Sequence, residues 1–195
     1  MENLEITVKV ETSLNELLNY LTSNNFRFHQ SFRCIDIFMI KKEEVNNVNS
    51  YEDFNKCIIL RELILKDKVL RQFIRKEKTF DREGRIIKSN QDIIDINNVP
   101  SRKIELEKEG YVELMRMDDY CYTFSKNNHE FIVEYVAPIG TFIEFEDRNF
   151  YSNLRNGESI EELITLFTTF KIKHDKSDYF VKKAWLLLNK EKKSQ

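Results

Sequence analysis

Hydrophobic and polar residues alternate at the start of the chain. In residues 4–10 (LEITVKV) aliphatic side chains occupy every second position, and the polar positions between them are Glu5, Thr7 and Lys9. A period of two residues is typical of a β-strand whose two faces differ in polarity. The polar face is either a solvated surface or the inner wall of a site, and the first residues alone leave both interpretations open.

The same kind of pattern recurs along the chain and predicts about eight strands. Aromatic and β-branched residues dominate the further strand-like runs, which are separated by turn residues. These runs cover residues 26–40, 56–67, 69–80, 84–96, 111–124, 129–137 and 140–147. The polar segment 41–55 between the second and third strands is predicted to be a loop.

Helical spacing of apolar residues marks the remaining segments. A short amphipathic helix with an N-cap at Thr12 or Ser13 is predicted after the first strand, and a second helix between Ser101 and Gly110. Helices are also expected in residues 159–170 and 177–193. Many antiparallel strands with few helices predict an α+β protein built on a closed or nearly closed eight-stranded antiparallel β-barrel with covering helices.

Composition narrows the class of protein. The 195 residues, 41% of them hydrophobic, with 4 glycines and 2 prolines, predict a single domain over residues 1–195 with a helical C-terminal segment at 159–191. The formal net charge of −2 argues against nucleic acid or a membrane as the partner. Three cysteines without CxxC spacing predict neither a disulfide framework nor a zinc site, and we expect a reducing, cytoplasmic location.

Charged residues differ between the outer and middle strands of the predicted barrel. The first strand and the last two strands carry Glu5, Glu134, Glu144 and Glu146, whereas the middle strands carry Arg61, Arg75 or Lys76, Lys88 and Arg116. If the first and last strands are neighbours, their carboxylates gather on one wall and raise one another's pKa unless a cation lies among them. Mg²⁺ or Mn²⁺ would satisfy that wall, and the basic wall would bind polyphosphate. The alternative is that these charges are scattered and solvated.

Five segments resemble the CYTH domain, the triphosphate tunnel metalloenzyme family that includes class IV adenylyl cyclases, thiamine triphosphatases and inorganic triphosphatases. The opening Glu-x-Glu-x-Lys strand of the family corresponds to Glu5, Thr7 and Lys9, and the next strand keeps Asp36 and Phe38. The segment IVEYVAPIGTFIEFE resembles a family segment whose landmarks fall on Glu134, Gly140, Phe142, Glu144 and Glu146. The Lys-x-Arg pattern corresponds to Arg116 and Asp118, and residues 177–185 resemble the family's terminal helix.

The resemblance implies a metal-dependent site for a small molecule that contains a triphosphate. It assigns Lys9, Glu144 and Glu146 to catalysis and Lys9, Arg61, Lys76, Lys88 and Arg116 to phosphate binding. It assigns Mg²⁺ or Mn²⁺ to the carboxylates of Glu5, Glu134, Glu144 and Glu146. Three positions depart from the family pattern: Thr7 replaces a glutamate, Asp118 replaces an arginine, and Lys88 and Asn90 replace an Arg-x-Glu pair.

Four functions follow as expectations. The first is hydrolysis of an inorganic, thiamine or nucleoside triphosphate, in which a metal ion polarises the phosphoryl group and orients water. The same residues could hold ATP while its ribose 3′-oxygen attacks the α-phosphorus, which would give cyclic AMP. The departures also allow a protein that binds phosphate or nucleotide without turnover, or a pure interaction protein, and the chain could act as a monomer or a homodimer.

Overall fold

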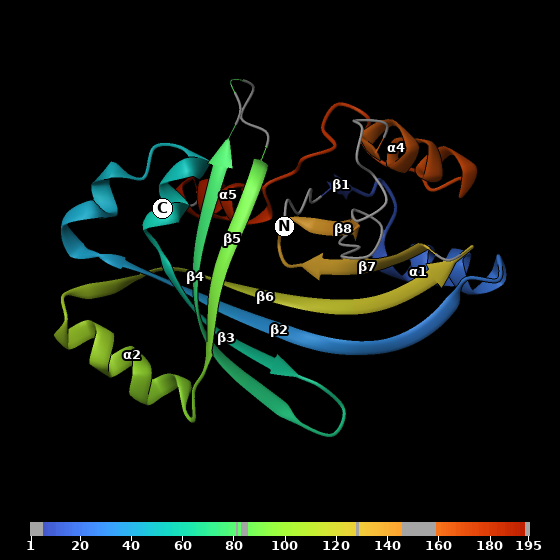
Figure 1. The fold of residues 1–195 in the computed structure, drawn as a ribbon. Helices are drawn as coiled ribbons and strands as arrows, with labels where there is room; N and C mark the ends of the chain where they lie inside the picture. The colour runs from blue at the N-terminus through green and yellow to red at the C-terminus, as the bar shows by residue number, and fades with distance from the viewer. Residues whose placement is uncertain (1–5, 81, 83–85, 128, 146–158, 194–195) are drawn as a thin grey trace. The chain divides into compact units, whose positions relative to one another are not determined.

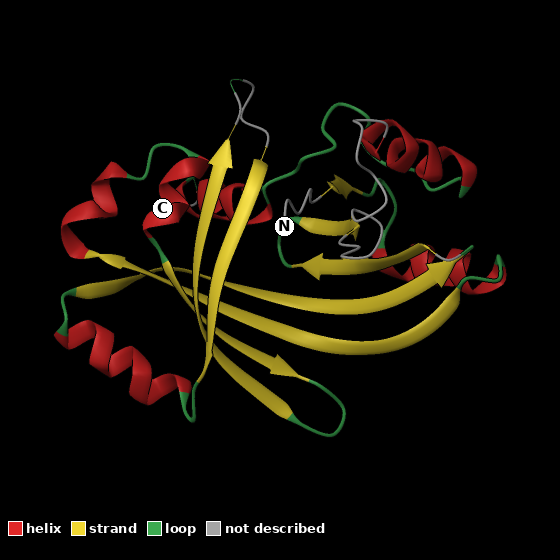
Figure 2. Ribbon diagram, in the orientation of Figure 1, coloured by secondary structure: helices red, strands yellow, loops and turns green. Residues whose placement is uncertain are grey.

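The computed structural model describes residues 6–80, 82, 86–127, 129–145 and 159–193, apart from the side chains of 86–89 and 159–163. Within these residues the protein is α+β, with one eight-stranded sheet (Figures 1 and 2). The strands are β1 (Ile6–Lys9), β2 (Arg27–Lys41), β3 (Ile58–Ile64), β4 (Val69–Phe80), β5 (Ile86–Asp95), β6 (Tyr111–Lys126), β7 (His129–Val136) and β8 (Gly140–Phe145). The helices are α1 (Leu14–Ser23), η1 (Lys42–Asn47), η2 (Tyr51–Lys56), α2 (Val99–Lys108), α4 (Ser159–Thr169) and α5 (Lys183–Lys192).

The strands follow the hydrogen-bonded order β1-β8-β7-β6-β2-β3-β4-β5. The ladders β1–β8, β7–β8, β2–β3, β3–β4 and β4–β5 are antiparallel. The first strand therefore pairs with the last, as the acidic wall requires. No ladder joins β1 to β5 within the described residues, so the sheet is open at these two ends.

The chain divides into two compact units. The first comprises residues 1–31 and 120–183, and the second comprises residues 32–119 and 184–195. The long strands β2 and β6 contribute residues to both units. Each unit has a hydrophobic cluster of its own, described separately below.

The core of the first unit lies on the aliphatic face of β1. Ile6 and Val8 are fully buried against Leu21 of α1 and Phe167 of α4. Burial of such side chains contributes roughly 1.5–3 kcal/mol each. A capping box starts α1, because the Ser13 hydroxyl accepts from the Glu16 backbone N–H and the Glu16 carboxylate accepts from the Ser13 backbone N–H. Ser13, one of the two predicted N-caps, is therefore confirmed.

The outer edge of β1 is covered by the C-terminal part of the first unit. The backbone N–H of Thr7 donates to the carbonyl of Tyr179 at 3.1 Å, and that of Val181 donates to the carbonyl of Thr7 at 3.0 Å. Val10 forms a further bridge with His174. β1 thus has hydrogen-bonded neighbours on both edges, β8 on one side and residues 174–181 on the other.

In the second unit α2 packs on one face of the sheet. Val99 and Leu106 of α2 contact a cluster that includes Leu60 and Phe73. Two 3₁₀ helices replace the loop that the sequence predicted at 41–55, so that prediction is wrong. A capping box between Ser50 and Asp53 starts η2.

The other two helix predictions differ from the structure at their starts. The N-cap of α2 is Asn98, three residues before the predicted Ser101. The last helix begins at Lys183, because the preceding Tyr179–Val181 backbone is hydrogen-bonded to β1. Among the described residues no helix is long and apolar enough to span a bilayer.

Candidate functional site

The polar parity of β1 is removed from water at Thr7. Thr7, on that parity, is only 1% exposed. It lies opposite Glu144 of β8, and its hydroxyl donates to Glu144 Oε2 at 3.5 Å. Lys9, two residues further on the same parity, is exposed and stands opposite Phe142. At Thr7 the polar face is therefore not a solvated surface.

Two predicted metal ligands meet on this face. Glu144 of β8 and Glu134 of β7 share the parity of Thr7, and both carboxylates are bound by the ammonium group of Lys183. Lys183 Nζ donates to Glu144 Oε2 at 2.6 Å and to Glu134 Oε2. The three charged side chains are only 10–11% exposed. We call Glu134, Glu144 and Lys183 the carboxylate–lysine cluster.

As arranged here, these residues do not fit a divalent ion. The ammonium group already lies between the carboxylate oxygens that would face the ion. Among the described residues there is no cluster of three or more His, Cys, Asp or Glu side chains that could hold a metal. Glu5 and Glu146, the other two predicted ligands, lie outside the described residues.

A second pair of opposite charges is buried in the other unit. Asp36 of β2 lies opposite Arg61 of β3, and the guanidinium group binds the carboxylate through Nε at 2.7 Å and Nη2 at 2.6 Å. Asp36 is 2% exposed. Burial alone would raise the pKa of Asp36, but the charge and hydrogen bonds of Arg61 outweigh burial and hold that pKa below its usual value. The pair is therefore ionised at neutral pH.

Lys76 joins this pair on the same face of the sheet. Arg61 lies opposite Gln72 of β4, and Lys76 shares the parity of Gln72. The positive charge of Lys76 also helps to lower the pKa of Asp36, after the larger contribution of Arg61. We call Asp36, Arg61 and Lys76 the arginine–lysine cluster, and it contains two of the predicted phosphate-binding residues.

The structure does not bring Lys88 and Arg116 to this cluster. The backbone of Lys88 lies opposite Thr79, at the parity of Arg75 rather than that of Lys76. Arg116 is an exposed residue of β6 whose Nε lies 3.6 Å from Glu113 Oε1. The sequence predicted that four cations of the middle strands lie on one wall of the barrel. The strand register brings only Arg61 and Lys76 to the same face.

Asp118, where the family has an arginine, has a partner in the same unit. Its carboxylate accepts from Arg33 Nε at 2.7 Å and Nη2 at 2.5 Å. These hydrogen bonds hold the pKa of Asp118 below its usual value. Arg33 and Asp36 stand on opposite faces of β2, because they are three positions apart in the strand. The negative charge of Asp118 is thus neutralised by Arg33, away from the face that carries Arg61.

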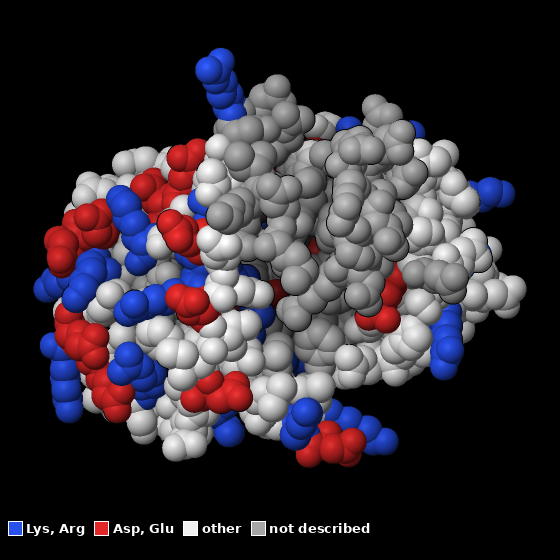
Figure 3. All heavy atoms as spheres, viewed as in Figure 1, with Lys and Arg blue, Asp and Glu red and all other residues white. Residues whose placement is uncertain are grey.

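A cavity of about 430 Å³ lies in the second unit, and only part of the predicted site contributes to it. Its lining includes Lys56, Arg75 and Lys76 together with the carboxylates of Glu77 and Asp92. Arg61 is not among the lining residues. On the surface around α2 and the 3₁₀ helices, Lys and Arg side chains are mixed with Asp and Glu side chains (Figure 3).

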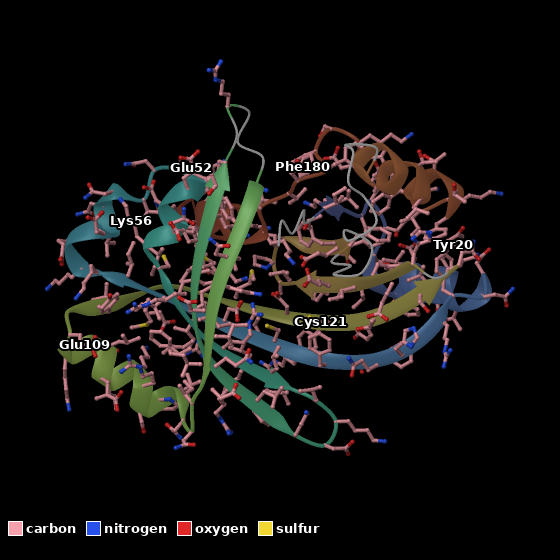
Figure 4. The ribbon with its side chains drawn as sticks, in the orientation of Figure 1. Tyr20, Glu52, Lys56, Glu109, Cys121 and Phe180 are labelled. Carbon is pink, nitrogen blue, oxygen red and sulfur yellow. The ribbon has the colours of Figure 1, made fainter. Side chains whose placement is uncertain are left out.

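His174, Cys121 and Trp185 lie outside these clusters and are buried or half-buried. His174 is 4% exposed, and its ring lies 4.7 Å from that of Phe167. Cys121 of β6 is buried (Figure 4) and is a free thiol. Trp185 is half-buried and makes an edge-to-face contact with Phe54 of η2 at 6.3 Å.

Lys183 is the functional candidate that sequence reasoning missed. It stands in the segment SDYFVKKAW, which was interpreted only as part of a helix. Its partners are 49 and 39 positions away in the chain, so no local pattern marks the contact. The available signal was indirect: two carboxylates on strands predicted to be neighbours need a cation, and a lysine can supply it.

No family model matches the sequence, and no curated protein sequence matches it. Solved structures do match. The PH1819 protein of Pyrococcus horikoshii OT3 has a TM-score of 0.68 at 14% identity, with 96% of this chain and 99% of that chain covered. A Hippeastrum protein described as a candidate adenylyl cyclase with a dominant triphosphatase activity has a TM-score of 0.60 at 12% identity, with 97% and 96% covered.

A third likeness is to a chain of the Schizosaccharomyces pombe Mediator head module. It has a TM-score of 0.57 at 9% identity, and 88% of this chain and 95% of that chain are covered. One fold can carry unrelated functions, so function must be argued from the site. At these identities the likenesses show the fold that this chain shares with these proteins.

Proposed function

We propose that this protein binds a small molecule containing a triphosphate and hydrolyses it. The observation that carries the proposal is the arginine–lysine cluster, in a fold shared with a protein described as having triphosphatase activity. The cluster places two cations beside the carboxylate of Asp36, and the buried carboxylate of Asp119 also acts on Arg61. Two cations on one face of a sheet offer hydrogen-bond donors and positive charge to an anion.

Asp36 prepares Arg61 for this role. It uses Nε and Nη2 of the guanidinium group, and Nη1 makes no hydrogen bond within the described part of the chain. The guanidinium group of Arg61 is therefore fixed in orientation, and its Nη1 can still donate to phosphate oxygens. Lys76, on the same face, supplies a second cation. Fixed cations of this kind also stabilise the charge that develops on the departing phosphate during hydrolysis.

The role of Lys9 in this proposal is more limited. Lys9 is exposed, and its Cε lies 3.6 Å from the position that a Cβ at Gly140 would take. Gly140 has φ +112°, which favours glycine, and its missing side chain leaves the lysine stem room at the turn between β7 and β8. Lys9 belongs to the first unit, so its role in phosphate binding stays a prediction of the resemblance.

Binding without turnover is the second candidate function. The observation that favours it is that Lys183 occupies the carboxylates expected to hold the metal ion. Cyclic nucleotide formation is the remaining enzymatic alternative. The products separate the three: phosphate release indicates a hydrolase, cyclic nucleotide a cyclase, and saturable binding without product a binding protein.

The first test is a titration of the purified protein with tripolyphosphate, followed by product assays with tripolyphosphate, thiamine triphosphate, ATP and GTP. Each is run with Mg²⁺, with Mn²⁺ and in EDTA. Lys76→Met should weaken tripolyphosphate binding about tenfold, as expected for loss of one charge-assisted contact of about 1.4 kcal/mol. Lys66→Met, an exposed lysine in the β3–β4 turn, is the matched control and should change affinity little.

The absence of saturable tripolyphosphate binding under all three conditions would overturn the proposal. Equal weakening by Lys76→Met and Lys66→Met would show that binding follows overall charge rather than this cluster. Circular dichroism of each variant establishes that the fold is retained. Size-exclusion chromatography with light scattering tests separately whether the protein is a monomer or a homodimer.

A further inference from the structure

We propose that Lys183 is the resident cation of the carboxylate–lysine cluster, and that its ammonium group takes the position in which two carboxylates would otherwise hold a divalent ion. The consequence for phosphate chemistry, which rests on the proposed function, is that this chain binds triphosphate without a metal ion at Glu134 and Glu144. The chain itself thus supplies, through Lys183, the cation that these two carboxylates need.

The first argument is the geometry of the cluster. Lys183 Nζ donates to Oε2 of Glu144 and to Oε2 of Glu134, so a single positive charge lies between two carboxylates. All three side chains are about nine-tenths buried. Two carboxylates in such surroundings cannot both ionise cheaply without a cation, because they repel each other and have lost most of their water. Lys183 provides that cation.

The second argument concerns how the lysine is delivered. The segment that precedes it is fixed on β1, since the Val181 N–H donates to the Thr7 carbonyl at 3.0 Å. Helix α5 begins at Lys183 itself. Thr7, opposite Glu144, is the residue whose backbone holds this segment. Backbone pairing of the preceding residues with β1 therefore fixes the point from which the Lys183 side chain extends.

The third argument is competition between cations. A divalent ion would need the carboxylate oxygens that the ammonium group holds, together with further oxygen ligands to complete its coordination. It would also have to displace a positive charge that is covalently tethered next to the site. The free carboxylate pair has a charge of −2, but the cluster with Lys183 has only −1, which weakens the attraction for a second cation.

The test is direct measurement of Mn²⁺ binding, without any phosphate ligand, by electron paramagnetic resonance of free Mn²⁺ and by calorimetry. Wild-type protein should show no Mn²⁺ binding that depends on Glu144. Lys183→Met should bind one Mn²⁺ at least about tenfold more tightly than wild type, which corresponds to about 1.4 kcal/mol. Adding Glu144→Gln to Lys183→Met should abolish that gain.

Lys182→Met is the matched control, because it removes the neighbouring positive charge, whose Nζ lies 5.8 Å from the Phe180 ring centroid. It should leave Mn²⁺ unbound, as in wild type. Wild-type Mn²⁺ binding that Glu144→Gln removes would overturn the proposal. A folded Lys183→Met variant that gains no Mn²⁺ binding would overturn it as well.

Lys183→Met leaves two buried carboxylates without their cation, so it could fail to fold in EDTA. In that event Mn²⁺ should restore its circular dichroism and raise its Tm, whereas failure of Mn²⁺ to do so contradicts the proposal. Because no phosphate is present, these results are independent of triphosphate binding. Tripolyphosphate titration in EDTA then tests the metal-free consequence alone.

Discussion

The two units bury charge in opposite arrangements. In the first unit one ammonium group, that of Lys183, lies between the two carboxylates of Glu134 and Glu144. In the second unit one carboxylate, that of Asp36, holds Arg61, and Lys76 stands on the same face. The first cluster therefore has one cation for two acids. In the second unit two cations lie beside Asp36, and the buried carboxylate of Asp119 also acts on Arg61, so the acids do not outnumber the cations. The two clusters thus differ in their ratio of cations to acids.

The difference also shows which cluster suits which ligand. Phosphate binding requires donors that remain after internal pairing, and the guanidinium group of Arg61 retains Nη1. In the carboxylate–lysine cluster the single cation is shared by two acids, so little of its charge is left for an anion. Variants that remove one charge at a time test this difference between the two clusters.

The largest effect is expected for Arg61→Met. This change leaves Asp36 buried without its partner, and loss of one member of a buried ion pair typically costs about 3–5 kcal/mol. The control is Arg71→Met, which removes a more exposed pair with Glu62 and should cost at most about 1 kcal/mol. Urea unfolding measures both. Adding Asp36→Asn to Arg61→Met should recover a large part of the loss, and no recovery would show that Arg61 stabilises by packing instead.

In the first unit the lone cation should matter more than either acid. Lys183→Met in EDTA should lower the free energy of unfolding by about 3 kcal/mol, the low end for a broken buried pair. Glu144→Gln should cost only about 1–2 kcal/mol, because Lys183 keeps Glu134 as its partner. Chemical denaturation of both variants gives the ranking. If Glu144→Gln lowers the free energy of unfolding as much as Lys183→Met does, the single cation matters no more than one of the two acids.

A smaller effect is expected from acid. The folded-state pKa of Asp36 lies below its usual value, so the unfolded chain binds more protons than the folded chain between the two values. Asp36 therefore stabilises the fold above its unfolded pKa, and this contribution is lost as the pH falls through the folded value. Unfolding measured from pH 7 down to pH 3 should lose stability more steeply in wild type than in the Asp36→Asn, Arg61→Met double variant. Equal slopes would show that Asp36 does not titrate differently in the two states.

The smallest effect concerns the thiols. Burial raises the pKa of Cys57 to about 12, and Cys34 beside Asp36 is raised as well. At pH 8 about one Cys57 thiol in ten thousand is then ionised, so alkylation of the native protein should be slow. Mass spectrometry after iodoacetamide treatment, with and without urea, compares these thiols with Cys121 of the first unit. Rapid native alkylation of Cys57 alone would indicate local opening near η2.

Features set by neighbouring residues were within reach of the sequence. The Ser13 and Glu16 capping box spans three positions, and strand alternation identified Ile6 and Val8 as core residues. The Ser50 and Asp53 box that starts η2 carries the same kind of signal, although 41–55 was expected to be a loop. Such features need no knowledge of the remote parts of the chain.

The remaining features depend on register and on remote contacts. Arg116 belongs to the opposite parity from buried Met115 and Met117, and a shift of one residue moves a side chain to the other face of a strand. The contact of Lys183 with Glu134 joins residues 49 positions apart. Neither the face of Arg116 nor the partner of Lys183 follows from composition or spacing, because both are set by how distant strands align.

The pairing of β1 has a consequence for synthesis of the chain. Thr7 meets Glu144, 137 positions later, and its backbone binds residues 179 and 181. A ribosome therefore releases this strand well before residues 140–145 and 174–181, which pair with it, have been made. Contacts of such high sequence separation are slow to form, and exposed strands are prone to aggregate. β1 therefore stays without its partner strand until the chain has grown by 137 positions beyond Thr7.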